Sequence, residues 1–175
     1  MTEKQENILS AALELFAEEG FKATSTSRVA KKANVSEGLI FRHFKNKEGL
    51  LEAIIQKGEE KAKLMFADIV LETEPKEVLR KTFQIKDAMA GDEKEGAFWK
   101  LQYKLKWELE RYGENKMESL KVALRNAFNK LGYEEPEEEA VNLMVLIDGL
   151  ATRFYLQEGF NIDSQIEFLY RKYNI

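Results

Sequence analysis

The stretch from residue 25 to residue 50 constrains the fold most, because it predicts two short helices separated by a tight turn. Ser25 can cap the first helix, since its hydroxyl can accept hydrogen bonds from free backbone N–H groups. Asn34 suits the turn, because asparagine tolerates the left-handed conformation that a helix C-cap requires. The inward face of the first helix consists of small residues, which allow another helix to approach closely. These residues are Val29, Ala30 and Ala33.

The second short helix has an apolar face that points inward and a second face that is available for contacts outside the protein. Ser36 is placed to cap this helix, and Ile40 and Phe44 are four residues apart, so they share the inward face. The remaining side chains are expected to point away from this support. They are Glu37, Gly38, Leu39, Phe41, Arg42 and His43. Two short helices in this order predict a helix-turn-helix, in which the second helix enters the major groove of DNA.

The charge of this region agrees with a polyanion site. Between residues 20 and 47 there are seven basic residues and one acidic residue, in a chain whose formal net charge is −4. The basic residues are Lys22, Arg28, Lys31, Lys32, Arg42, Lys45 and Lys47. A basic segment on an acidic protein is typical of nucleic-acid binding. The alternative is a solvated helix face, and the coincidence with the helix-turn-helix favours the first interpretation.

A longer string of residues joins these motifs to a known family. The string consists of Ile8, Ala12, Leu15, Phe16 and Gly20, then Val29-Ala30, Ala33, Val35-Ser36 and Gly38, then Phe44-Lys45-Asn46-Lys47-Glu48 and Leu50. It resembles the DNA-binding domain of the tetracycline-repressor (TetR) family of bacterial regulators. Two positions depart from the family pattern. Asn34 stands where the family usually has Gly, and Phe41 stands where it usually has Tyr, so a hydroxyl that commonly touches a phosphate is absent.

The whole chain is expected to be all-α. No stretch alternates with period two, and no hairpin turn signal is present. The resemblance implies an N-terminal three-helix helix-turn-helix module, joined by a long helix to a C-terminal helical effector-binding and dimerisation domain, with about nine helices. The expected domains are residues 2–62, with the helix-turn-helix at 25–44, and residues 63–175. The remaining helices are expected at about residues 4–19, 47–71, 75–90, 97–112, 115–131, 136–158 and 163–173, with a loop at 91–96.

The resemblance also assigns roles toward DNA. The positions expected to face base edges are Glu37, Gly38, Leu39 and Arg42. Arg42 can make a bidentate contact with guanine, and Glu37 can accept from a cytosine amino group. Leu39 can only pack, most naturally against a thymine methyl group. Phosphate contact for Arg42 and core packing for Leu39 remain open alternatives. The positions expected to contact the DNA backbone are Ser25, Thr26, Arg28, Ser36, Phe41, His43 and Lys47.

A homodimer on a pseudo-palindromic operator is expected, because one recognition helix covers only a few base pairs. The resemblance places the interface on the last two long helices. The helix at 137–158 is apolar nearly all round, which predicts burial on every side, whether by a partner or as the central helix of a monomeric bundle. The candidate interface residues are Val141, Met144, Val145, Asp148, Gly149 and Thr152. Asp148 has two further interpretations: it could be a structural partner of Thr152, or it could contact a polar ligand.

The resemblance further implies a small-molecule effector bound among the middle helices. Trp99, Tyr103 and Trp107 recur at a spacing of four and share one helix face. The candidate pocket residues are Met65, Phe66, Phe83, Met89, Trp99, Tyr103, Trp107 and Phe154. This composition favours a hydrophobic or aromatic effector. An aromatic stripe of this kind is also typical of an ordinary core, and that alternative stays open.

The composition argues against an enzyme. The chain has no cysteine and one histidine, so no catalytic residues, no metal site and no cofactor are expected. Residues 1–7 are polar, and the most apolar run, 141–151, is too short to span a bilayer, so a cytoplasmic protein without a membrane partner is expected. The expected function is sequence-specific transcriptional regulation, in this family mostly repression relieved by a ligand. The alternative is an architectural or adaptor protein that binds DNA without an effector.

Overall fold

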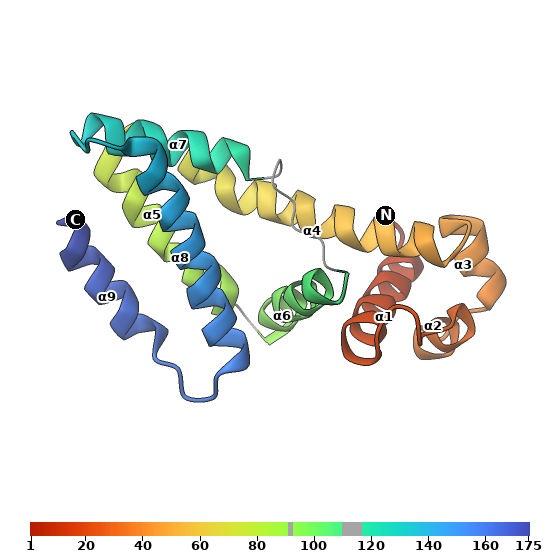
Figure 1. Ribbon diagram of the computed structural model, residues 1–175. Helices are drawn as coiled ribbons and strands as arrows, with labels where there is room; N and C mark the ends of the chain where they lie inside the picture. Colours follow the sequence, from red (N-terminus) through yellow and green to blue (C-terminus); the bar gives the residue numbers. More distant parts are fainter. Residues whose placement is uncertain (91–92, 110–116) are drawn as a thin grey trace. The chain divides into compact units, whose positions relative to one another are not determined.

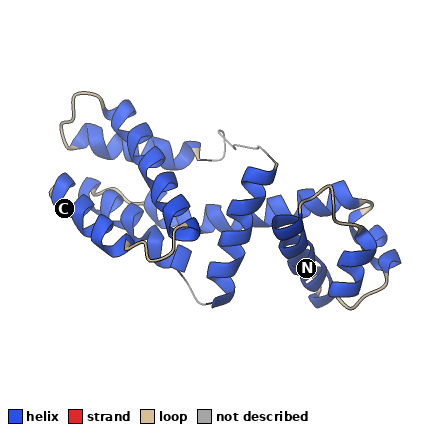
Figure 2. Ribbon diagram, turned by 60° about the horizontal axis from the view of Figure 1, so that its bottom comes forward, coloured by secondary structure: helices blue, strands red, loops and turns tan. Residues whose placement is uncertain are grey.

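The computed structural model describes residues 1–90, 93–109 and 117–175, and every regular element in these ranges is an α-helix (Figures 1 and 2). The helices are α1 (Glu3–Glu19), α2 (Thr26–Lys32), α3 (Glu37–Phe44), α4 (Lys47–Val70), α5 (Pro75–Ala90), α6 (Glu93–Glu108), α7 (Glu118–Lys130), α8 (Pro136–Leu156) and α9 (Ile162–Tyr173). The prediction of an all-α chain is confirmed. Among these helices, none combines the length and the apolar character that crossing a membrane would need.

The described residues divide into two compact units. The N-terminal unit contains residues 1–62 and 97–109, and the second unit contains residues 63–90, 93–96 and 117–175. The long helix α4 contributes to both units. Most of α6 packs with the N-terminal unit, although it lies in the part of the sequence assigned above to the second domain.

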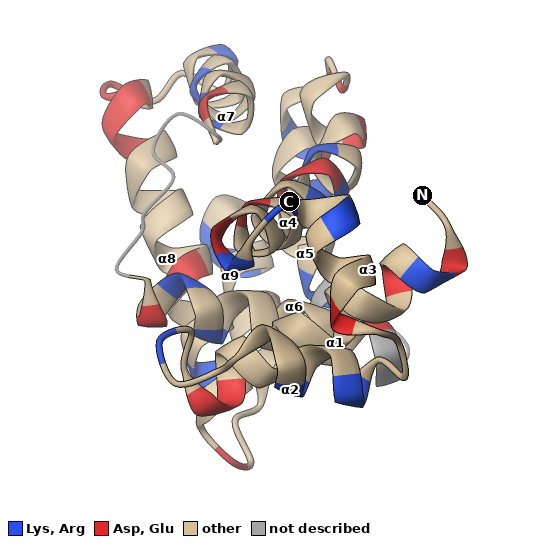
Figure 3. Cartoon of the chain, turned by 90° about the vertical axis from the view of Figure 1, so that its right-hand side faces the viewer, with Lys and Arg blue, Asp and Glu red and all other residues tan. Residues whose placement is uncertain are grey.

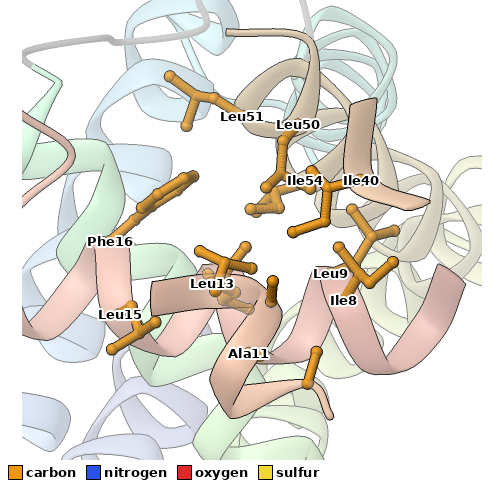
Figure 4. Packing of buried hydrophobic residues seen from close by; sticks show 14 of the residues in the cluster. Ile8, Leu9, Ala11, Leu13, Leu15, Phe16, Ile40, Leu50, Leu51 and Ile54 are labelled. Atoms are coloured by element: carbon orange, nitrogen blue, oxygen red, sulfur yellow. The ribbon is translucent and has the colours of Figure 1, made fainter. Parts of the chain in front are cut away.

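The N-terminal unit is built on a continuous apolar core beneath the helix-turn-helix. Helix α1 begins with a capping box, in which the Thr2 hydroxyl accepts from the Gln5 N–H and the Gln5 side chain accepts from the Thr2 N–H. Figure 4 shows apolar side chains of α1, α3 and α4 converging in this core. Leu105 of α6 is buried in the same cluster. Each fully buried side chain of this size contributes about 1.5–3 kcal/mol to folding.

The second unit has a separate core, in which aromatic rings of α5, α7 and α9 lie close to one another. Phe83 of α5 lies with its ring centre 5.7 Å from that of Tyr170 and 5.8 Å from that of Tyr173, both on α9. Phe128 of α7 lies 5.7 Å from Tyr173 in the same way. Phe83 is fully buried there. Of the candidate pocket residues, it is therefore the one that the structure places within an ordinary core.

Two ion pairs join α5 to the segment before it and to α9. Lys81 of α5 donates to Glu72 at 2.6 Å. This bond, together with the backbone N–H groups of Glu74 and Thr73, lowers the pKa of the Glu72 carboxyl to about 2. Lys86 of α5 pairs with the carboxylate of Asp163 of α9 at 2.6 Å. The corner between α4 and α5 and the contact between α5 and α9 are both held by charged groups.

Helix boundaries in the described residues differ from expectation by two or more residues at two places. Helix α8 ends at Leu156, two residues earlier than expected, and Gln157 leaves the helical conformation. Helix α6 begins at Glu93, inside the stretch expected to be a loop. The expected end of this helix near residue 112 and the start of the next near residue 115 lie outside the described residues.

Candidate nucleic-acid interface

The helix-turn-helix forms where the sequence predicts it. The Ser25 hydroxyl caps α2 by accepting from the Arg28 N–H at 3.3 Å. Asn34 takes the turn with a φ of 53°, in the left-handed region. Val29 and Ala30 are buried against the core, as expected from their small size. The local geometry of α2 and of the turn is therefore encoded within a few residues.

The expected cap of α3 is wrong in one respect. Ser36 occupies the N-cap position with an extended backbone, but its side chain makes no capping hydrogen bond. Helix α3 begins without that bond because it packs on the core through Ile40. The Ser36 side chain is exposed, and its hydroxyl is left available for a partner outside the chain.

Helix α3 has one buried face and one open face. Ile40 is fully buried, and Phe44 packs partly buried against the same core. On the other side, Arg42 is exposed and Phe41 is 45% exposed. Gly38 is also exposed, and a Cβ added there would meet no atom within 4 Å. The open face of α3 is thus free of other protein groups in the described chain around Gly38.

The expectation that Leu39 points away from the core that supports α3 is wrong. Its side chain is half-buried and packs against the N-terminal core. One edge of α3 therefore rests on the core through Leu39 as well as Ile40, since helix positions one apart can both border a broad apolar face. Core packing, the alternative interpretation of Leu39, accounts for part of its role.

Two of the predicted contact residues are bonded to each other. The Thr26 hydroxyl donates to Oε1 of Glu37 at 2.6 Å, and both side chains are half-buried. This hydrogen bond joins the first residue of α2 to the first residue of α3. The position of the Glu37 carboxylate is therefore set by α2, which the sequence analysis did not predict.

Three of the seven cations of this segment already have partners within the protein. Arg28 donates to Glu19 at 2.7 Å, and Lys32 pairs with Glu14. Figure 3 shows the basic residues in blue and the acidic residues in red. Because both acids belong to α1, a charge count restricted to residues 20–47 overstates the excess of positive charge. The cations with neither an ion pair nor a hydrogen bond from the side chain in the described chain are Lys22, Lys31, Arg42 and Lys45.

Lys47, the third cation that has partners within the protein, turns inward at the start of α4. Its Nζ donates to the backbone carbonyls of Phe21 at 2.9 Å and Thr24 at 3.1 Å. The same ammonium lies 4.4 Å from the centre of the Phe21 ring. In this arrangement Lys47 holds the segment between α1 and α2 rather than facing outward toward a phosphate.

His43 is held from the side of α1. Its Nδ1 lies 3.2 Å from Nε2 of Gln5, within hydrogen-bonding distance. With Gln5 donating, Nδ1 is the acceptor, so the ring proton of a neutral imidazole lies on Nε2. Among the described groups nothing bonds Nε2, so this atom is the one available for a DNA phosphate.

One contact in the N-terminal unit was not predicted from the sequence. The Gln102 side chain of α6 donates to the backbone carbonyl of Ile54 in α4 at 3.0 Å. It lies over Gly58, where an added Cβ would come within 2.7 Å of the Gln102 Oε1. Gly58 therefore provides the room that lets α6 pack closely on α4. A single glycine within a long helical pattern could have suggested such a close approach.

The candidate interface residues of α8 separate into an exposed set and a half-buried set. Val145 is 64% exposed, Val141 and Gly149 are also exposed, and Met144 packs partly buried against the second core. The Thr152 hydroxyl donates to the backbone carbonyl of Asp148 at 2.8 Å. One apolar stripe of α8 stays open within the chain, which goes against the alternative of a central helix in a monomeric bundle. Burial of this stripe by a partner remains a prediction. Phe168 of α9, 52% exposed, belongs to the same unit and was not predicted.

The candidate effector residues fall in both units. Met65, Phe66 and Phe154 are half-buried in the second unit, together with the buried Phe83. The side chain of Met89 lies outside the described residues. The aromatic stripe of α6 belongs to the N-terminal unit, where Trp99 and Tyr103 are half-buried and Trp107 is 66% exposed. No single unit contains the whole predicted set.

Comparison with known proteins agrees with this geometry. Residues 8–54 match the model of the family described as bacterial regulatory proteins, tetR family. The uncharacterised HTH-type transcriptional regulator YvkB of Bacillus subtilis is 51% identical over 55 residues, which are 31% of this chain and 29% of that protein. The chain aligns with about three tenths of the length of the curated relatives it matches first.

Solved structures resemble nearly the whole chain. One is NalD, the secondary repressor of the MexAB-OprM multidrug efflux pump in Pseudomonas aeruginosa, with a TM-score of 0.72, 20% identity, and coverage of 98% of this chain and 95% of that one. Another is FadR from Bacillus subtilis in complex with stearoyl-CoA, with a TM-score of 0.68, 20% identity, and coverage of 96% of both chains. At such identities the likeness shows a shared fold alone.

A supported helix-turn-helix whose second helix has an open face is the arrangement typical of helix-turn-helix DNA-binding proteins. Residues 8–54, which contain this arrangement, match the TetR family of bacterial regulatory proteins. The matched family is one of regulators rather than enzymes.

Proposed function

We propose that this protein is a sequence-specific DNA-binding transcriptional regulator. The observation that carries the proposal is the two-sided character of α3. Ile40 anchors the helix in the core, while the Arg42 guanidinium is exposed and has no ion pair or hydrogen bond in the described chain. An unpartnered guanidinium on a rigid, exposed helix is well suited to bidentate contact with a guanine edge in the major groove.

The other residues of the interface divide between base reading and backbone contact. Glu37 is placed to accept from an amino group of a base, and the open space at Gly38 allows the start of α3 to approach base edges closely. Ser36, with an exposed hydroxyl, and His43, through Nε2, are placed to contact phosphates. Ser25 lies at the start of α2, where its hydroxyl already caps the helix.

The regulator is proposed to act as a homodimer on a pseudo-palindromic operator. Support comes from the open stripe of α8, where Val141, Val145 and Gly149 are exposed, and from the exposed Phe168 of α9 in the same unit. Exposed apolar side chains that gather on one surface are typical of a protein interface. A two-fold dimer would also present two recognition helices to two half-sites.

A small hydrophobic or aromatic effector is proposed to release the regulator from DNA, which makes it a repressor. The half-buried Met65, Phe66 and Phe154 of the second unit offer adaptable apolar surface for such a ligand. The structure of FadR from Bacillus subtilis contains stearoyl-CoA, a ligand with a long apolar chain. To act as a switch, the effector must bind the DNA-free arrangement more tightly than the DNA-bound one.

The full-length protein tests the DNA proposal directly. A duplex library with a randomised central segment is passed over the protein, the bound fraction is sequenced, and the affinities of the selected duplex and of a scrambled duplex are compared at one salt concentration. Regulation predicts a preference well above tenfold, in the usual range of about 10³–10⁷. A preference below about tenfold would instead support an architectural protein without sequence reading.

The effector proposal has its own test. The two tryptophans, Trp99 and Trp107, report on α6 by their fluorescence. Stearoyl-CoA is the probe, titrated first with the free protein and then with the protein on its selected duplex. A saturable change in fluorescence with release of DNA supports an apolar effector. Binding to neither form contradicts an acyl-chain effector.

A further inference from the structure

The hydrogen bond between Thr26 and Glu37 has a consequence for how this protein distinguishes bases. The distance of 2.6 Å between the Thr26 hydroxyl and Oε1 of Glu37 lies in the range of charge-assisted O–H···O⁻ bonds. Both side chains are half-buried, so water competes less for this bond than at an exposed position. The Thr26 hydroxyl therefore restricts the rotamer of Glu37.

The single hydrogen of a hydroxyl limits what Thr26 can do at the same time. While it is donated to Glu37, it is not available for a phosphate oxygen. Thr26 is therefore poorly suited to the simple phosphate contact expected from the sequence. Glu37 keeps Oε2, for which the described residues supply no hydrogen-bond partner. The pair thus presents Oε2 of Glu37 at the start of α3, as a hydrogen-bond acceptor that is held in place and has no partner in the described chain.

We propose that Thr26 is a positioning residue for base reading by Glu37. Thr26 holds Oε1 so that Oε2 accepts from an exocyclic amino group in the major groove, the N4 amino group of cytosine or the N6 amino group of adenine. Without the restraint, the flexible carboxylate would also sample positions nearer the DNA phosphates, where like charge repels it. This inference depends on the proposed function, since it assumes that α3 reads bases.

The start of α2 also supplies a matched control. Ser27 lies one residue after Thr26, and its hydroxyl is 3.0 Å from the Ser25 hydroxyl instead of bonding Glu37. Replacing Ser27 by alanine removes a hydroxyl from the same turn of the same helix but leaves the Glu37 carboxylate held. Thr26→Val removes the hydroxyl with little change in side-chain shape, and Thr26→Ser keeps the hydroxyl while removing the methyl group.

The experiment compares base preferences of full-length proteins selected on the same randomised duplex library. The variants are wild type, Thr26→Val, Thr26→Ser, Ser27→Ala, Glu37→Ala and the double variant Thr26→Val/Glu37→Ala. Wild type is expected to prefer an amino-bearing base at one position of each half-site. Glu37→Ala and Thr26→Val are each expected to reduce that preference by about tenfold or more, leaving the other positions unchanged. Thr26→Ser and Ser27→Ala are expected to keep it.

The double variant separates positioning from an independent effect. If Thr26 acts through Glu37, the double variant has the same base preferences as Glu37→Ala alone, because the effects of coupled residues are not additive. Thermal unfolding of each variant confirms that the compared proteins are folded. Should Thr26→Val be unfolded, Thr26→Ala in its place tests the same hydroxyl.

Three outcomes would overturn the inference. An equal loss of affinity for all sequences in Thr26→Val would show a phosphate contact or a structural role. A Thr26→Ser variant that behaves like Thr26→Val would show that the methyl group, not the hydroxyl, matters. If Glu37→Ala leaves every base preference intact, Glu37 reads no base. A wild-type protein that selects no sequence at all would contradict the proposed function itself. Failure of the proposed function is therefore distinguishable from failure of the inference about Thr26.

Discussion

The Lys47 ammonium donates to the backbone carbonyl of Phe21 at 2.9 Å and lies 4.4 Å from the centre of the Phe21 ring. It also donates to the Thr24 carbonyl at 3.1 Å. The first residue of α4 therefore holds the connection between α1 and α2 in place.

Replacing Lys47 by methionine is expected to lower the free energy of unfolding by about 1–3 kcal/mol, because carbonyls bonded to a charged donor lose their partner. Urea unfolding measures the change. Lys22→Met is the control, since Lys22 is exposed and its side chain has no partner in the described segment. An unchanged unfolding free energy, combined with a weaker salt dependence of DNA binding, would show that Lys47 serves a phosphate instead.

Glu19→Gln is expected to strengthen binding to DNA of any sequence. It removes the carboxylate that Arg28 contacts at 2.7 Å and leaves the guanidinium available for a phosphate. The slope of log affinity against log salt should steepen by up to about 0.9. Stability should change by less than about 1 kcal/mol, because the ion pair is on the surface.

Glu6→Gln is the matched control for this charge change. Glu6 also lies on α1, is exposed, and pairs with no cation in the described chain. Fluorescence anisotropy over a series of salt concentrations compares the two variants. If both variants strengthen binding equally, net charge alone is responsible and the release of Arg28 is not.

These contacts show which features the sequence could predict. The turn at Asn34 and the cap at Ser25 depend on residues within one or two helical turns, so pattern and propensity identify them. The partners of Lys32 and Lys47 lie 18 to 26 residues away. A positive charge read along the sequence does not reveal which acid or carbonyl the fold brings beside it. The base-facing and backbone-facing assignments came from the family resemblance and remain predictions.

The contact of Gln102 with Gly58 predicts a non-additive pair of substitutions. Alanine in place of Gly58 gains about 1 kcal/mol of helix propensity. In the wild-type background that gain is opposed, because the new Cβ would lie 2.7 Å from Oε1 and displace the amide from the Ile54 carbonyl. In a Gln102→Ala background, Gly58→Ala should stabilise by the full amount. Additivity within about 0.3–0.5 kcal/mol in urea unfolding would contradict this contact.

Val145→Glu is expected to convert the proposed dimer into a monomer. A charge would be placed in the open stripe of α8, where Val145 is 64% exposed, and a buried unpaired carboxylate is strongly unfavourable in an interface. Sedimentation velocity measures the mass of each species. Leu71→Glu is the control, because Leu71 is an exposed apolar residue directly after the end of α4 in the same unit. A monomeric wild type, or a dimeric Val145→Glu, would refute this interface.

The most direct test of base reading by α3 is the affinity of Arg42→Ala for the selected duplex and for a scrambled duplex. Arg42 is exposed and unpaired in the described chain, so the substitution leaves folding unchanged. The selected duplex should lose about 1–3 kcal/mol of binding, with relaxed preference at one base pair, while the scrambled duplex loses little. An equal loss on both duplexes would contradict base reading and leave Arg42 as a phosphate contact.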